Sequence, residues 1–313
     1  ETGVLLDRIH RIKFSNLKLK EKVHICHNHL LPNIYKKMGL EGMINFSDEA
    51  LIYIIEYYTL EAGVRKLKEK LFDIVGDINL NILQNNDDID NEYPLDITID
   101  NIKNKYFKNV QDIRIKQINP NDRIGHANGM WANAIGQGGT LPIEASMYPS
   151  EQFLQLKLTG RQGDVMQESM NVALTIAYRL TPANQIKEIE KKYNKVSKWG
   201  IHLHTPSASD PKNGPSAGSC ITSVIYSLLN NKPIKHEFAL TGEIRLDGSI
   251  TAIGGLDLKI LGSMKSGITN FIYPEENQRD VDELKEKCEK DEILKGIELY
   301  PVSTIEEVFS LIF

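Results

Sequence analysis

The sequence has 313 residues, 41% of them hydrophobic and 25% charged, with a formal net charge of −5. These values are ordinary for a soluble globular protein of roughly two domains. They argue against a dedicated nucleic-acid binder, which carries a basic face, and no run of roughly 18 or more apolar residues is present that could span a membrane.

The chain starts with ETGVLLDRIH, which contains neither an initiator Met nor the apolar core of a signal peptide. We therefore expect the sequence to be a piece of a longer protein. Its cysteines, Cys26, Cys220 and Cys288, are odd in number and scattered. This favours a reducing compartment, so we expect an intracellular protein of the cytoplasm or of an organelle matrix.

Residues 1–84 are predicted to form a helical domain. Apolar side chains recur at helical spacing, first after Ser47 and then from Val64 onward. The two sets are Leu51, Ile54, Ile55 and Tyr58, and Val64, Leu67, Leu71, Ile74, Val75 and Ile78.

The motif HICHNH, near the start of this domain, raises the question of a metal site. It places His24, Cys26, His27 and His29 within six residues. On a helix these side chains point to different faces, so at most two could converge, whereas a structural zinc ion needs four ligands. We therefore expect a polar helix surface and no metal.

Residues 85–112 are predicted to be a linker or surface loop. The segment NILQNNDDIDNEYPLDITIDN is dominated by Asn and Asp and has no hydrophobic period. We place the domain boundary in this segment.

Residues 113–313 alternate between strand and helix signals. WGIHLH alternates in polarity and predicts a strand. Asp164 and Gln167 resemble a capping box at the start of a helix that ends at Leu180, and Asp247-Gly248 predicts a hairpin. LDLKILGSMKSG predicts a short helix ended by Gly267, followed by the strand ITNFIYP. The whole chain is therefore expected to be α+β, a helical domain followed by an α/β domain.

The stretch DPKNGPSAGSC, residues 210–220, places Ser216 between a turn and a helix. Apolar residues follow at helical spacing, namely Ile221, Val224, Ile225, Leu228 and Leu229. Ser216 could be the N-cap of this helix, which from position alone is the commoner use. It could also be a nucleophile whose oxyanion is stabilised by free amides at the helix start.

Two residues could activate a serine nucleophile. His204 lies twelve residues upstream on the polar face of a predicted strand. Lys259 lies on a helix expected to bury Leu258, Leu261 and Met264, and partial burial would lower the pKa of its amine. Spacing alone favours an ordinary surface lysine. The Gly-rich stretch GQGGT at 136–140 lacks the Lys-Ser/Thr of a Walker-type phosphate loop.

Several stretches together resemble the proteolytic domain of the Lon family of ATP-dependent serine proteases. They are TGRQGDVMQES, IHLHTPSASDPKNGPSAG, ALTGEIRLDGSITAIGGLDLK and SGITNFIYPEENQRD. LLDRIHRIKF and YYTLEAGVRKLKEKL resemble the end of the Lon ATPase module and its helical subdomain. The resemblance covers nearly the whole chain except residues 85–112.

This resemblance implies a Ser–Lys dyad. Ser216 would be the nucleophile and Lys259 its base, while Thr241 of the T-G-E motif would help to hold the lysine. His204 would lie near the site without acting as the base. Backbone amides from Gly214 to Ala217 are expected to form the oxyanion hole.

The resemblance also implies a larger, ATP-dependent assembly. Arg8 would match the arginine finger of the ATPase and Arg65 its sensor arginine, both reading ATP and Mg²⁺ bound to a core absent from this sequence. Peptide hydrolysis itself would need no metal or cofactor. The family degrades unfolded or damaged proteins and works as a homohexamer.

The sequence departs from the family pattern at the motif that carries the serine. Asn213 stands where the family usually has Asp, which removes a charge beside the dyad. The lysine motif has Asp257 and Leu258 in place of the family's Lys-Glu, and the glycine-rich turn around residue 136 is longer than usual.

Two other function classes are kept open. NGPSAGS faintly resembles the phosphate loop of small-molecule GHMP kinases, although that interpretation leaves Lys259 and the T-G-E hairpin unexplained. The chain could also be a catalytically silent Lon-like scaffold, but a decayed site has no reason to retain both Ser216 and Lys259.

Overall fold

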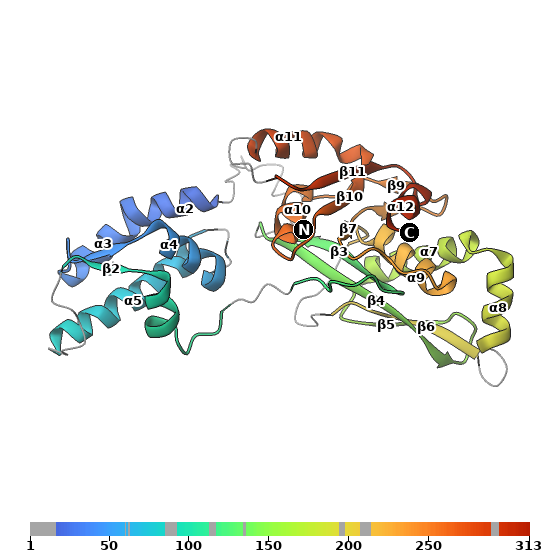
Figure 1. Cartoon of the computed structure of the whole chain (residues 1–313), viewed down its shortest axis with the longest axis horizontal. Coiled ribbons are helices and arrows are strands. Elements are labelled where there is room, and N and C mark those ends of the chain that lie inside the picture. The colour runs from blue at the N-terminus through green and yellow to red at the C-terminus, as the bar shows by residue number, and fades with distance from the viewer. Residues whose placement is uncertain are drawn as a thin grey trace, which may run out of the picture. The chain divides into compact units, whose positions relative to one another are not determined.

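The computed structural model describes residues 17–59, 61, 63–84, 93–112, 117–133, 136–193, 198–206, 214–288 and 294–313. The chain forms two compact units, residues 1–114 and 115–313, each with its own core. Figure 1 shows the elements of both units. Arg8 and Asn213, which were singled out in the sequence, lie outside the described residues.

The first unit is largely helical, as its periodicity predicts. Its elements are α2 (Leu19–Ile25), η1 (Cys26–Leu30), α3 (Leu31–Met38), β1 (Ile44–Phe46), α4 (Asp48–Ile54), η2 (Ile55–Thr59) and α5 (Arg65–Leu83). Ser47 caps α4, because its Oγ accepts a hydrogen bond from the Ala50 amide at 3.2 Å. The predicted apolar face of α5 is buried from Leu67 to Ile78.

The prediction of a linker or surface loop over residues 85–112 is wrong for residues 95–107. β2 (Leu95–Ile97) pairs in parallel with β1, and α6 (Ile99–Asn101) and η3 (Ile102–Tyr106) follow it. Ile97, Ile102 and Phe107 are buried in the core of the first unit. These few apolar residues anchor a segment whose remaining composition is that of a loop.

The second unit is built on a seven-stranded mixed sheet with the order β11-β10-β7-β3-β4-β6-β5. Its strands are β3 (His126–Ala132), β4 (Gly138–Ser150), β5 (Leu156–Thr159), β6 (Lys198–His204), β7 (Phe238–Leu240), β10 (Asn270–Pro274) and β11 (Glu298–Val302). β4 pairs antiparallel with β3 and β6, and the other neighbours are parallel. A separate hairpin joins β8 (Glu243–Ile244) to β9 (Ile250–Thr251), as Asp247-Gly248 predicts.

Helices cover both faces of this sheet (Figure 1). One core contains residues of α7 (Asp164–Leu180), α8 (Ala183–Tyr193), α9 (Gly218–Asn230) and α12 (Ile305–Ile312). The other contains residues of α10 (Leu256–Met264) and α11 (Gln278–Cys288). On β10, Ile272 belongs to the first core, whereas Phe271 and Tyr273 belong to the second, as the alternation of a strand requires. The predicted α+β class is confirmed.

Local predictions in the second unit are mostly confirmed. β6 covers the predicted strand 199–204, and α7 ends at Leu180. The capping box is wrong: Gly163 is the N-cap of α7, and its carbonyl accepts the Gln167 amide at 3.0 Å. Within the described residues, no helix combines the length and apolar character needed to cross a bilayer.

Candidate active site

Ser216 lies in a tight turn directly before α9. The Gly218 amide donates to the carbonyl of Pro215 at 3.0 Å, and the Gly242 amide donates to the carbonyl of Ser216 at 2.8 Å. α9 begins at Gly218 with Ala217 as its N-cap. The N-cap interpretation of Ser216 is therefore wrong, because the helix starts two residues later. Ser216 is half-buried, and within the described residues no side chain caps the start of α9.

The start of α9 is pressed against the T-G-E segment. A Cβ on Gly218 would lie 2.6 Å from Cγ2 and 2.9 Å from the amide nitrogen of Ile244, so only glycine fits at this point. The Ser219 amide donates to the carbonyl of Gly242 at 3.0 Å. Main-chain hydrogen bonds in both directions therefore fix the serine turn to the residues that follow β7.

Thr241 connects the serine turn to the lysine. It is fully buried at the end of β7, and its amide donates to the carbonyl of Ile272 at 3.1 Å. Its hydroxyl donates to the carbonyl of Ser216 at 3.1 Å and accepts from Nζ of Lys259 at 3.2 Å. One hydroxyl thus uses both its donor and an acceptor site to join two chain segments.

Lys259 is a buried lysine, with 3% of its surface exposed. Burial disfavours the charged form and lowers the pKa of Lys259 from 10.5 to about 8. The expected burial pattern of α10 is wrong, because Leu258, Leu261 and Met264 are only partly buried. The buried positions, at spacings of three and four, are Leu256, Lys259, Ile260 and Ser263.

Two glycines allow α10 to approach the sheet closely. A Cβ on Gly262 would lie 2.0 Å from the carbonyl oxygen of Gly138, and a Cβ on Gly138 would lie 2.0 Å from that of Leu258 and 2.9 Å from the amide nitrogen of Lys259. The stretch GQGGT therefore has a packing function that the sequence analysis missed. The repeated glycine of GQGGT and the single Gly262 inside α10 were the available signal, since close backbone approach is a common reason for glycine.

The arrangement can carry acid–base chemistry at a serine. An amine with a pKa near 8 is partly neutral around physiological pH and can accept a proton. Among the described residues, no hydrogen bond joins Oγ of Ser216 directly to Nζ of Lys259, and the connection runs through Thr241. Catalytic hydrogen bonds are often long or absent before substrate binds, so the lack of a direct hydrogen bond is compatible with a dyad.

His204 is held by a different set of contacts. It ends β6, and its Nδ1 lies 2.8 Å from Oγ1 of Thr159. The same oxygen lies 2.9 Å from Nε2 of His202. Burial, Lys157 and His204 together lower the pKa of His202. Within the described residues, no hydrogen bond or ion pair joins His204 to Ser216 or Lys259.

The remaining candidate residues lie in the first unit. Arg65 is the first residue of α5, and its highly exposed side chain pairs with Glu69 at 3.5 Å. The HICHNH side chains do not converge. Cys26 is fully buried, and burial raises its pKa to about 12, whereas His27 is exposed and contacts Asp48 at 2.8 Å.

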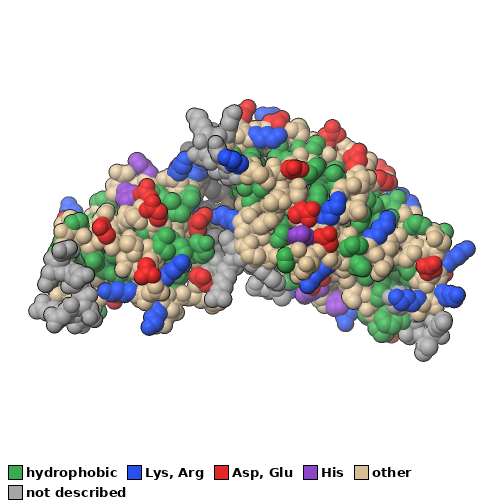
Figure 2. All heavy atoms as spheres, viewed as in Figure 1, with side chains coloured by type: hydrophobic (Ala, Val, Ile, Leu, Met, Phe, Trp, Pro, Cys, Tyr) green, Lys and Arg blue, Asp and Glu red, His purple; other side chains and the backbone are tan. Residues whose placement is uncertain are grey.

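Charge is mixed on the surface of the second unit. Figure 2 shows Lys and Arg side chains interspersed with Asp and Glu over the visible face of that unit. This mixture agrees with the small net charge of the chain, −5. The visible face therefore lacks the single-sign field expected of a nucleic-acid surface.

Comparison with known proteins gives two family matches. Residues 97–313 match the Lon protease (S16) C-terminal proteolytic domain, and residues 36–90 match the Lon protease AAA+ ATPase lid domain. The first match includes the serine turn, Thr241 and Lys259.

Curated Lon proteases align along most of the chain. Lon protease of Clostridium acetobutylicum is 35% identical over 283 residues, which are 90% of this chain and 34% of that protein. The Mycoplasma mobile protein is 35% identical and the Vibrio parahaemolyticus protein 34% identical, each over 99% of this chain and over 35% and 37% of their own lengths. The chain thus spans about a third of the relatives it matches. Since the proteolytic-domain match alone covers more than half of the sequence, the chain belongs to the Lon protease family.

Proposed function

We propose that this chain is a serine endopeptidase in which Ser216 is the nucleophile and Lys259 is the general base. One observation carries the proposal. A buried lysine with a lowered pKa is joined, through the hydroxyl of Thr241, to the turn that presents the serine. A lysine binds phosphate through its positive charge, whereas the burial of Lys259 favours its neutral form. An inert scaffold needs no amine at that position.

The reaction begins with neutral Lys259, which takes the proton of Ser216 as its Oγ attacks a peptide carbonyl. Lys259, now an ammonium, donates that proton to the leaving amine, and water hydrolyses the acyl-enzyme. Thr241 can accept from the amine in both protonation states, so it holds Lys259 through the cycle. No metal or cofactor takes part in these steps.

The oxyanion formed in this attack needs backbone donors. Of the segment expected to supply them, Gly214 to Ala217, Pro215 has no N–H. The next amides along the chain, those of Gly218 and Ser219, already donate to Pro215 and Gly242. We therefore assign the oxyanion hole to amides of Gly214, Ser216 and Ala217.

The longer protein would couple this site to nucleotide hydrolysis. By family likeness, ATP and Mg²⁺ would bind a core outside this sequence, with Arg8 and Arg65 as nucleotide-sensing residues. Its substrates would be unfolded or damaged proteins, and its assembly a homohexamer.

The test is labelling and peptidase activity of the Ser216→Ala variant. We expect the wild type to react with a fluorophosphonate and to cleave an unfolded protein that carries a fluorescent label. The variant should lose the labelling, and its cleavage rate should fall by roughly 10³-fold or more. Ser219→Ala is the matched control, because Oγ of Ser219 is buried without a hydrogen-bond partner among the described residues, so its loss removes no hydrogen bond of the turn. Equal cleavage by Ser216→Ala and wild type would exclude Ser216 as nucleophile.

A further inference from the structure

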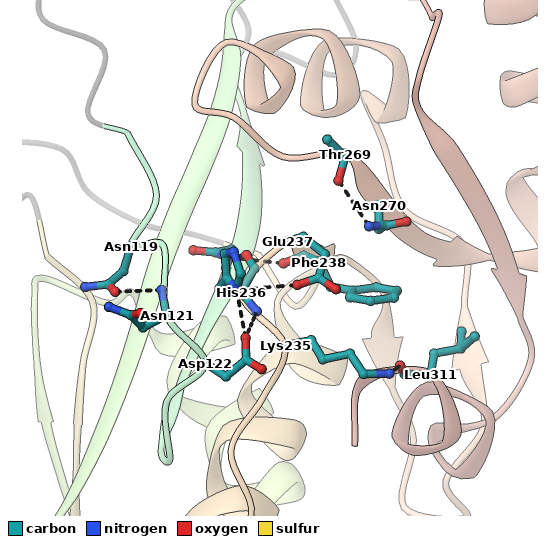
Figure 3. A network of polar contacts seen from close by, with 11 residues as sticks. Asn119, Asn121, Asp122, Lys235, His236, Glu237, Phe238, Thr269, Asn270 and Leu311 are labelled. Atoms are coloured by element: carbon teal, nitrogen blue, oxygen red, sulfur yellow. Dashed lines mark hydrogen bonds and ion pairs between the residues drawn. The ribbon is translucent and has the colours of Figure 1, made fainter.

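Three side chains of metal-ligand type meet where the segment before β3 passes the start of β7 (Figure 3). They are Asp122, His236 and Glu237. Nδ1 of His236 lies 2.7 Å from Oδ1 of Asp122 and 3.4 Å from Oε2 of Glu237. All three potential ligand atoms lie within 4.8 Å of one another.

The backbone around this cluster is fixed before any ion binds. Arg123 and Ile234 exchange main-chain hydrogen bonds at 3.3 and 3.0 Å, which locks the two segments together. The His236 amide donates to Oδ1 of Asp122 at 3.0 Å, and Nδ2 of Asn128 donates to the carbonyl of His236 at 2.8 Å. A ligand set held this way loses little conformational freedom on binding.

The charge and exposure of the cluster suit a divalent cation. The carboxylates of Asp122 and Glu237 make the cluster acidic. The three side chains are between 35% and 46% exposed, so an ion can enter from solvent. Lys235, the neighbouring cation in the sequence, directs its Nζ to the carbonyl of Leu311 at 2.7 Å (Figure 3). Its charge still acts on Asp122, whose pKa it helps to lower after the larger effect of the hydrogen bonds from His236.

We propose that Asp122, His236 and Glu237 bind one divalent transition-metal ion of the Zn²⁺ class. Metal–ligand bonds of about 2.0–2.1 Å at tetrahedral angles separate the ligand atoms by roughly 3.3 Å. The distance from Nδ1 of His236 to Oε2 of Glu237 is 3.4 Å and fits. The 2.7 Å distance to Asp122 has to widen by about 0.6 Å to reach that separation.

The chemistry of the ligands selects the ion. An imidazole nitrogen favours Zn²⁺, Co²⁺, Ni²⁺ or Cu²⁺ over Mg²⁺ and Ca²⁺, which prefer oxygen ligands alone. When the ion binds, Nδ1 of His236 releases its proton to solvent and gives its lone pair to the metal. Three protein ligands leave the remaining coordination to water.

The bound ion would cross-link parts of the chain that are 114 residues apart in sequence. An ion that binds only the folded state stabilises it by mass action, so the melting temperature rises with metal concentration. This inference does not depend on the proposed peptidase activity, and its test measures binding.

The test uses the full chain without a histidine tag, stripped with a chelator. Zn²⁺ binding is measured by calorimetry, and Co²⁺ binding by its visible absorption, which reports coordination. We expect one ion per chain and a rise in melting temperature with Zn²⁺. Asp122→Asn with Glu237→Gln, which keeps the shape of the cluster and hydrogen-bond acceptors for His236, should weaken binding at least tenfold, as should His236→Ala.

His27→Ala is the matched control, because His27 and Asp48 form an exposed pair at a similar distance, 2.8 Å, and no third potential ligand among the described residues completes a cluster with them. This variant should bind Zn²⁺ as the wild type does. The proposal is overturned if the wild type takes up no ion, if the cluster variants bind as tightly as the wild type, or if the loss occurs in His27→Ala instead.

Discussion

The two residues of the candidate dyad are held in place by different kinds of interaction. The serine turn is fixed by main-chain hydrogen bonds, with the Gly242 amide on the carbonyl of Ser216 and the Ser219 amide on the carbonyl of Gly242. The lysine helix is fixed by contact, because Gly138 and Gly262 let α10 approach β4 with no side chain between them. The difference teaches where each half is vulnerable. Side-chain changes at the serine spare the hydrogen bonds that hold its turn, whereas a single methyl group at Gly138 or Gly262 can displace the helix that carries Lys259.

Replacing the lysine tests the comparison most severely. Lys259→Met keeps an unbranched apolar stem in a buried site, so we expect it to fold and to lose activity by roughly 10²–10⁴-fold. Lys259→Arg should be equally inactive, because a guanidinium cannot accept the serine proton. Circular dichroism with the peptidase assay separates folding from catalysis. An active arginine variant would rule out the dyad.

The pH dependence follows from the burial of the lysine. Only the neutral amine is active, so with a pKa of about 8 the rate should rise about tenfold per pH unit below pH 8 and level off above it. The folded-state pKa is lowered, so the unfolded chain binds more protons between about pH 8 and 10.5. The free energy of unfolding should therefore rise with pH in that window, and Lys259→Met should lack this rise. A rate that is flat from pH 6 to 9 contradicts the assignment.

A methyl group at the contact between α10 and β4 tests whether close packing positions Lys259. Gly262→Ala places a Cβ 2.0 Å from the carbonyl oxygen of Gly138, so α10 must shift. We expect a loss of about 1–3 kcal/mol in unfolding free energy and a loss of activity of about tenfold. Gly254→Ala is the control, since a Cβ there meets nothing within 4 Å. Chemical denaturation measures the unfolding free energy of both variants, and the peptidase assay measures their rates. Equal stability and equal rates of the two variants would show that close packing does not position Lys259.

The smallest effect is expected from the charge beside the serine. Asn213→Asp restores the residue usual in the family, and a carboxylate near the dyad would favour the ammonium form of Lys259. The rise of activity should then move to higher pH, by less than about one pH unit. Matched pH–rate profiles measure the shift. An unchanged profile removes this electrostatic effect and leaves the dyad intact.

Local signals predicted the elements but not the contacts between them. The periodicity of α5, the alternation of β6 and Asp247-Gly248 each depend on neighbours in sequence, and all three were predicted. The dyad residues were named through motif resemblance, because a lysine on a helix gives no sign of burial by itself. The buried face of α10 was misassigned because Lys259 and Ser263 lie on it, and a hydrophobic pattern does not count polar residues.

Contacts between segments that are distant in sequence could not be predicted, because local patterns report only on neighbouring residues. β2 depends on pairing with β1, about fifty residues earlier in the chain, and its composition resembles that of a loop. The Gly138–Gly262 contact and the Asp122–His236–Glu237 cluster join segments that only the sheet order brings together. Sequence spacing carries no information about such distances.

The hydroxyl of Thr159 lies between two imidazoles and links the positions of the protons on their ring nitrogens. It lies 2.9 Å from Nε2 of His202 and 2.8 Å from Nδ1 of His204, yet it has only one proton to give. With both bonds formed, at least one of the two ring nitrogens must itself carry a proton. If neutral His202 holds its proton on Nδ1, its Nε2 accepts the proton of the Thr159 hydroxyl, and His204 must then be protonated on Nδ1. The tautomer of one histidine on β6 thus restricts the tautomer of the other through the Thr159 hydroxyl on β5.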